Sequence, residues 1–145
     1  WLPSALIGGT PGTEDGVSFA NWLTAHGLTG QATDDDDLDQ LSNLLEYGFG
    51  TDPLDPASVG PIASLVTDSG GDYLALTVTR GLTATDILFY PEVSEDLVNW
   101  SSDPLDIVLF SSLNNGNGTV TEVYRSTIPS ASLTRQFMRM VVEMK

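Results

Sequence analysis

The spacing of the apolar residues changes its period near residue 60. Before this point, apolar side chains recur at helical spacing in two segments, Ser18–Gly27 and Leu41–Gly48, which predicts two short helices. Ser18 is a good N-cap for the first helix, and Gly27 is a good stop. Helices this short bury little surface alone, so we expect them to pack on the rest of the chain.

Beyond residue 60 the period becomes two, as in half-buried strands. In the clearest segment, Leu74, Leu76 and Val78 share one face, so we expect Tyr73 on the opposite face to be exposed. Turns rich in Gly, Asn, Ser and Pro separate the segments. The predicted strands are Ile62–Thr67, Tyr73–Arg80, Asp86–Val93, Leu105–Phe110, Thr119–Arg125 and Gln136–Glu143.

These elements predict a mostly β fold with a short α-helical N-terminal segment. No helical crossover separates the strands, so we expect a small antiparallel β-sandwich. The predicted organisation has three parts: a Gly- and Pro-rich linker at residues 1–16, a helical segment at 17–60 and a β-sandwich domain at 61–145. The chain begins at Trp1 without a Met, so we interpret it as a piece of a longer protein.

The charge balance narrows the expected partners. The chain carries 20 acidic and 5 basic residues, a net charge of −15, and residues 1–60 contain no Lys or Arg. This balance is opposite to that of nucleic-acid binders, and we expect cations as partners. No apolar run is long enough for membrane insertion. Cysteine is absent and His26 is the only histidine, which excludes thiolate chemistry and His-rich metal sites.

The sharpest motif is an acidic run that has the ligand order of a twelve-residue calcium loop. Counted from Asp35, acids fall at positions 1, 3 and 5, a backbone carbonyl at position 7, Asn43 at position 9 and a glutamate at the bidentate position 12. Starting at Asp34 instead places leucines at positions 5 and 12, so only one register works. The predicted Ca²⁺ ligands are Asp35, Asp37, Asp39, the Leu41 carbonyl and Glu46.

One position departs from the calcium-loop pattern. Position 6 usually holds Gly because the backbone there has a positive φ, and here it is Gln40. A non-Gly residue in that conformation costs about 1–2 kcal/mol, which predicts weaker affinity or a different bend. The alternative interpretation is a solvated acidic loop beside the positive end of a helix. A second cation at Asp68 and Asp72, which flank a Gly-rich turn, is a further hypothesis.

The segments Phe19–Leu23, Asp35–Glu46, Tyr47–Pro53, Asp96–Trp100 and Arg135–Met140 together carry a family resemblance. They resemble a C-terminal module of secreted multidomain proteins of Verrucomicrobia and Planctomycetes, whose calcium segment is similar to dockerin loops and thrombospondin type 3 repeats. The resemblance implies an extracellular or cell-surface location and the same calcium ligands. It also implies a non-catalytic structural or interaction role at the end of a larger protein, with upstream domains as partners.

Two other functions stay open at this point. A carbohydrate-binding module is the alternative, with aromatic residues such as Tyr73 on a sandwich face, and its partner would be a glycan instead of a protein surface. An enzyme is not expected, because the sequence contains neither a Gly-x-Ser-x-Gly elbow nor a second histidine, and nothing selects a carboxylate pair among its acids.

Overall fold

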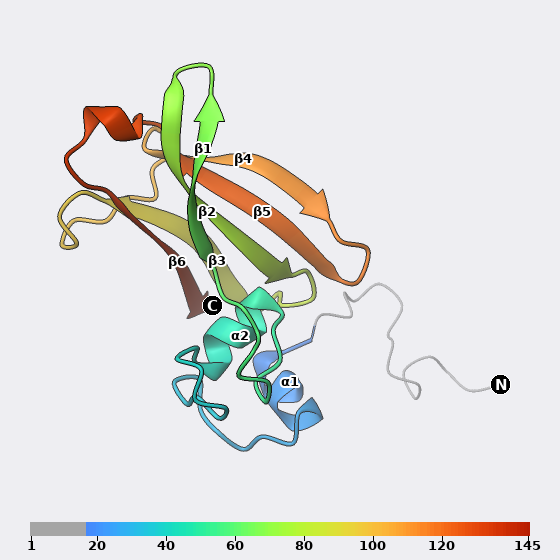
Figure 1. Cartoon of the computed structure of the whole chain (residues 1–145). Helices are drawn as coiled ribbons and strands as arrows, with labels where there is room; N and C mark the ends of the chain where they lie inside the picture. Colours follow the sequence, from blue (N-terminus) through green and yellow to red (C-terminus); the bar gives the residue numbers. More distant parts are fainter. Residues whose placement is uncertain (1–16) are drawn as a thin grey trace.

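The computed structural model describes residues 17–145, in which two short helices precede six strands (Figure 1). The helices are α1 (Phe19–Ala25) and α2 (Asn43–Phe49), and no helix in this range is long and apolar enough to cross a membrane. The strands are β1 (Ile62–Asp68), β2 (Gly71–Gly81), β3 (Ile87–Ser94), β4 (Ile107–Asn114), β5 (Thr119–Ser126) and β6 (Phe137–Met144), with a 3-10 turn, η2 (Ser130–Ser132), before β6. The predicted linker, residues 1–16, lies outside the described residues.

The strands form two antiparallel sheets, one of four strands in the order β1-β2-β5-β4 and one made of β3 and β6. The long strand β2 pairs with β1 along its first part and with β5 along its second. The predicted fold class is therefore confirmed: the chain is mostly β, with a short helical segment ahead of a small antiparallel sandwich.

Strand β4 begins later than the alternation of residues predicts. The N–H groups of Leu105 and Ile107 bond to Asp103, which forms a turn and leaves the Leu105 side chain 81% exposed. A bulge between Leu109 and Ser111 then breaks the alternation within the strand. A bulge shifts the alternation of side chains between the two faces by one residue. The sequence pattern therefore predicts that a strand is present but not where it begins and ends.

Tyr73 is buried, which contradicts the prediction that it is exposed. Its side chain is only 7% exposed, because the Arg125 guanidinium of the neighbouring strand lies 4.2 Å from the ring centroid. Asp68 accepts a hydrogen bond from Arg125 at 3.0 Å and holds the guanidinium in place. A long side chain from another strand covers this face of β2, and alternation along one strand does not report such a contact.

One core joins the helical segment to both sheets. Its buried residues come from α1, α2, β2, β3 and β6, and they are Phe19, Leu23, Tyr47, Phe49, Val78, Ile87 and Val142. Figure 1 shows both helices gathered at one end of the strands. The helices therefore pack on the β-sheets, as their short length predicts.

Asp86, immediately before β3, ties both helices to the sheets. Its carboxylate accepts the Phe19 N–H at 2.9 Å and the Tyr47 hydroxyl at 2.6 Å, and the same hydroxyl contacts the Val17 carbonyl. Its backbone carbonyl accepts the N–H of Lys145. Burial would raise the pKa of Asp86, but these hydrogen bonds and the Lys145 charge lower it below its ordinary value. Asp86 is thus held as an anion at the N-terminus of α1, where the helix dipole favours it.

The helix ends follow the predicted chemistry with one difference. The Ser18 hydroxyl caps α1 by accepting the Asn21 N–H at 3.2 Å. Helix α2 starts at Asn43, two residues after the predicted Leu41, and ends at a Gly50 C-cap with φ 68°, so Gly48, the last residue of the predicted range, lies inside it. Gly48 is inside the helix because its missing side chain gives Val142 room to pack against the backbone.

Gly48→Ala is expected to destabilise the protein by about 1 kcal/mol. A Cβ at this position would lie 2.9 Å from Val142 Cγ1, and such overpacking outweighs the roughly 1 kcal/mol that Ala contributes to a helix. Urea unfolding measures the change. If this contact is the cause, Val142→Ala should lower the free energy of unfolding less in the Gly48→Ala background than in the wild type. A single variant as stable as wild type would contradict the contact.

Candidate metal centre

The acidic loop between the helices turns alternate carboxylates inward. Asp35, Asp37 and Asp39 are half-buried, whereas Asp36 and Leu38 are exposed. Each of the three inward residues offers a carboxylate oxygen within 4.8 Å of those of the other two. This is the spacing of positions 1, 3 and 5 in the predicted register, and three carboxylates this close form a set of hard oxygen donors.

Backbone N–H groups hold the loop in this shape. The N–H of Asp39 donates to Asp35 and Asp37 at 3.2 Å, and the N–H of Gln40 donates to Asp35 at 2.9 Å. Asp39 itself accepts the N–H of Leu41 at 2.7 Å. The chain therefore wraps around the first aspartate, and each carboxylate is fixed by the loop that carries it.

Two residues of the loop have a left-handed backbone. Leu38 has φ 65° and Gln40 has φ 78°. A positive φ is what a calcium loop requires at position 6, so Gln40 adopts the conformation usually given to Gly. The bend of the loop is therefore kept without glycine, at a cost in backbone strain of about 1–2 kcal/mol.

Glu46 of α2 is the least exposed carboxylate of the segment. Its side chain is fully buried, and neither oxygen has a hydrogen-bond partner among the described residues. Burial raises the pKa of Glu46 to about 7, and the negative charges of Asp37, Asp39, Asp35 and Asp52 add to the rise. A buried carboxylate without a donor is costly, so this position calls for a positive charge.

Asp37 also has a buried oxygen and a raised pKa. One of its oxygens is buried and has no partner in the part of the chain that the structure describes. Burial raises its pKa, together with the charges of Asp39 and Asp35, against one backbone hydrogen bond from Asp39. The buried oxygens of the loop that lack a partner among the described residues thus belong to Asp37, Asn43 and Glu46, at loop positions 3, 9 and 12.

The structure brings together three of the five predicted ligands directly. Glu46 is not within the 4.8 Å group of aspartates, although all three of them raise its pKa. Leu41, whose carbonyl is the predicted position 7 ligand, is half-buried just before the Ser42 N-cap of α2. The residues at hand fit a calcium ion by chemistry, since carboxylate and carbonyl oxygens are the ligands that Ca²⁺ prefers.

Asn43 has a structural role that its loop position 9 alone does not reveal. It is fully buried, and its N–H donates to the Asp34 carbonyl at 2.7 Å. Its side-chain amide donates to Asp36 at 2.8 Å and to the Gln31 carbonyl at 3.4 Å. Asn43 therefore pins the start of the loop to the start of α2. A polar residue among the leucines of an apolar helix face is the sequence signal for it.

Neither of the other hypotheses gains support from the geometry. Asp68 is paired with Arg125, and Asp72 accepts the Thr67 hydroxyl at 2.6 Å, so both are already engaged. Tyr73, the aromatic residue named for a sugar platform, is buried, and the Arg139 guanidinium lies 4.1 Å from the ring centroid of Trp100.

Comparisons with known proteins returned no family model, no curated protein and no solved structure that matches this chain. The functional argument therefore rests on the residues of the chain itself.

Proposed function

We propose that this chain is a non-catalytic, extracellular calcium-binding module of a larger secreted or surface protein. The observation that carries the proposal is Glu46: a fully buried carboxylate with two unpartnered oxygens, beside three convergent aspartates. A divalent cation would compensate this buried charge. Among the common ones, Ca²⁺ accepts six to eight oxygens in flexible geometry, which suits a set of carboxylates and one carbonyl.

The role of the ion would be to order the junction between helices and sheets. Glu46 and Tyr47 are neighbours on α2, with Glu46 beside the loop and Tyr47 bonded to Asp86. Closing the coordination sphere through Glu46 would fix α2, and with it the contact that holds α1 and β3. The loop motif and its resemblance to secreted modules support the extracellular setting, where sites with dissociation constants of about 10⁻⁴–10⁻³ M are common.

Calcium is expected to raise the melting temperature of metal-stripped protein. At 100 times the dissociation constant, binding to the folded state alone adds about 2.7 kcal/mol, which corresponds to roughly 5–10 °C. Calorimetric titration should give a dissociation constant of about 10⁻⁶–10⁻³ M. Mg²⁺ is the control, because it demands a smaller octahedral site and should shift melting less. Absence of both heat and a melting shift at about 10 mM calcium would overturn the proposal.

Gln40→Gly is expected to tighten calcium binding by up to about tenfold. Residue 40 has φ 78°, which Gly adopts freely, so the substitution removes about 1–2 kcal/mol of strain. Greater freedom of the metal-free loop subtracts a few tenths to about 1 kcal/mol. Titration calorimetry on both proteins measures the difference. Equal or weaker binding by the variant would show that strain at this position does not limit affinity.

A further inference from the structure

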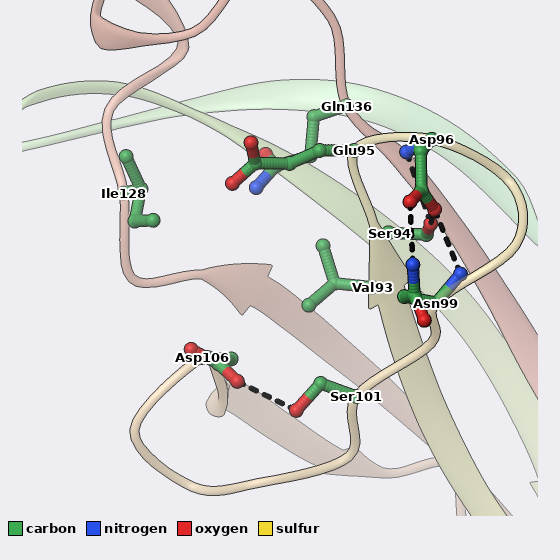
Figure 2. Close-up of a pocket in the computed structure, with 9 residues that line it drawn as sticks. All are labelled: Val93, Ser94, Glu95, Asp96, Asn99, Ser101, Asp106, Ile128 and Gln136. Carbon is green, nitrogen blue, oxygen red and sulfur yellow. Dashed lines mark hydrogen bonds between the residues drawn. The ribbon is translucent and has the colours of Figure 1, made fainter.

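A pocket of about 300 Å³ lies among the loops that flank β3, β4 and η2 and contains no residue of the acidic loop. Its volume is at the lower end of the range for small-ligand sites. Figure 2 shows the residues that line it, which are Val93, Ser94, Glu95, Asp96, Asn99, Ser101, Asp106, Ile128 and Gln136. They include three carboxylates and two apolar side chains, a combination that suits a ligand with a cationic head and an apolar stem.

Two of the carboxylates are available to a ligand. The Glu95 carboxylate accepts no hydrogen bond from the described part of the chain, and in Figure 2 it projects into the space between Ile128 and Val93. Asp106 lies across the pocket, where one of its oxygens accepts the Ser101 hydroxyl at 2.6 Å and the other is unengaged. Because the two acids line different sides, they do not converge on one point as the ligands of a metal ion must.

The third carboxylate, that of Asp96, stabilises the loop that lines the pocket. Asp96 accepts hydrogen bonds from the N–H groups of Val98 and Asn99 and from the Asn99 side chain, all between 2.7 and 2.8 Å. Hydrogen bonds from Asn99 in particular hold the pKa of Asp96 well below its usual range. Leu97 has a left-handed backbone with φ 64° in the turn that results. Asp96 thus shapes the loop and adds negative charge without contacting a ligand.

Gln136 lines the pocket, but its amide oxygen is not open to a ligand. Its amide nitrogen donates to Ser126 at 2.8 Å, which orients the group, and its oxygen is buried with no partner among residues 17–145. Arg135, the nearest basic side chain in the sequence, donates to the Glu95 carbonyl and so holds the backbone of the rim. The pocket therefore presents two carboxylates to a ligand, those of Glu95 and Asp106, and the Gln136 oxygen is out of reach.

We propose that this pocket binds a guanidinium group on an alkyl stem, as an arginine side chain carries it. A guanidinium has five N–H donors spread in a plane, so it can donate to Glu95 and to Asp106 on the two sides of the pocket, whereas an ammonium is a compact point charge. Its methylene stem would lie against Val93 and Ile128. The site is independent of the calcium loop, since the two share no residue.

The test is a titration of isotope-labelled, calcium-loaded protein followed by NMR. The probe is N-acetyl-arginine methylamide, and the matched control is its neutral citrulline analogue. We expect saturable shifts centred on the pocket residues, with a dissociation constant on the order of 10⁻³ M for a ligand of this size. Free arginine forms a second arm: tighter binding of the blocked form indicates a protein side chain as the natural ligand, and equal binding indicates the free amino acid.

Variants distinguish recognition of the charge from nonspecific binding. Glu95→Gln and Asp106→Asn should each weaken the arginine probe by about fivefold, because a partly exposed ion pair is lost. Glu143→Gln, an exposed acid outside the pocket, is the control and should bind as wild type does. Equal binding of the citrulline analogue, shifts elsewhere on the protein, or unchanged affinity in Glu95→Gln would each overturn the proposal.

Discussion

Glu46→Gln is expected to abolish most of the calcium response and, at the same time, to stabilise the metal-free protein. The two effects have one cause, which is a buried negative charge with no partner among the described residues. A unit charge about 4 Å from a cation contributes about 4 kcal/mol at an effective dielectric constant of 20. Its loss should weaken calcium binding by at least about 100-fold.

The gain in the metal-free state follows from the pKa of Glu46. Its folded value is about 7 against an ordinary 4.5, so protonation stabilises the fold below pH 4.5, and this contribution is lost as pH rises through 7. At pH 8 the ionised carboxylate therefore costs up to about 3 kcal/mol, which the neutral amide of Gln avoids. Chelator-treated wild type should lose stability between pH 5 and pH 8, and the variant should lose less.

Asp36→Asn is the matched control for this experiment. Asp36 is an exposed acid of the same run, and its contact with Asn43 survives because an amide oxygen also accepts a hydrogen bond. It should retain calcium binding within a few fold, since only a screened surface charge is removed. Equal losses in Glu46→Gln and Asp36→Asn would mean that the acidic run attracts cations diffusely and has no coordination sphere.

Asp86→Ala is expected to lower stability by about 3 kcal/mol, or roughly 10 °C in melting temperature. The substitution leaves the Phe19 N–H and the Tyr47 hydroxyl without their charged acceptor at the place where α1, α2 and β3 meet. A cycle with Tyr47→Phe should show coupling above about 1 kcal/mol, because the two side chains share a hydrogen bond. Additive losses in that cycle would show that the bond contributes nothing.

The pH dependence has the opposite sign from that of Glu46. The pKa of Asp86 is lowered in the fold, so its contribution is present above its ordinary value of 3.8 and is lost as pH falls through the folded value. Wild type and Asp86→Ala should therefore converge in stability in strong acid. Glu143→Gln removes an exposed carboxylate whose one hydrogen-bond partner among the described residues is Tyr90; it controls for net charge and should change stability by less than about 0.5 kcal/mol.

Local features were predictable from the sequence. The helix and strand periods, the Ser18 cap and the inward turn of Asp35, Asp37 and Asp39 all depend on residues a few positions apart. Spacing alone determines which of these side chains share a face, so their arrangement follows from reading along the chain. The same reasoning placed the left-handed backbone at residue 40.

Long-range contacts were not predictable in this way. Phe19 and Asp86 are 67 positions apart, and nothing in either local pattern pairs them. Tyr73 was predicted to be exposed because the alternation of β2 contains no information about Arg125 on β5. The pocket beside Glu95 depends in the same way on loops that converge only in the folded chain.

The four residues 83–86 anchor both ends of the described chain. Val17 donates to the Thr83 carbonyl, and Lys145 donates to the carbonyls of Thr85 and Asp86. A mechanical load applied through the segment before Val17 therefore enters the protein at this corner. The hydrogen bond from Val17 to Thr83 and the one from Tyr47 to Asp86 bear that load first. The hydrogen bonds between strands bear it only afterwards. We therefore expect this corner to open under force before any strand separates.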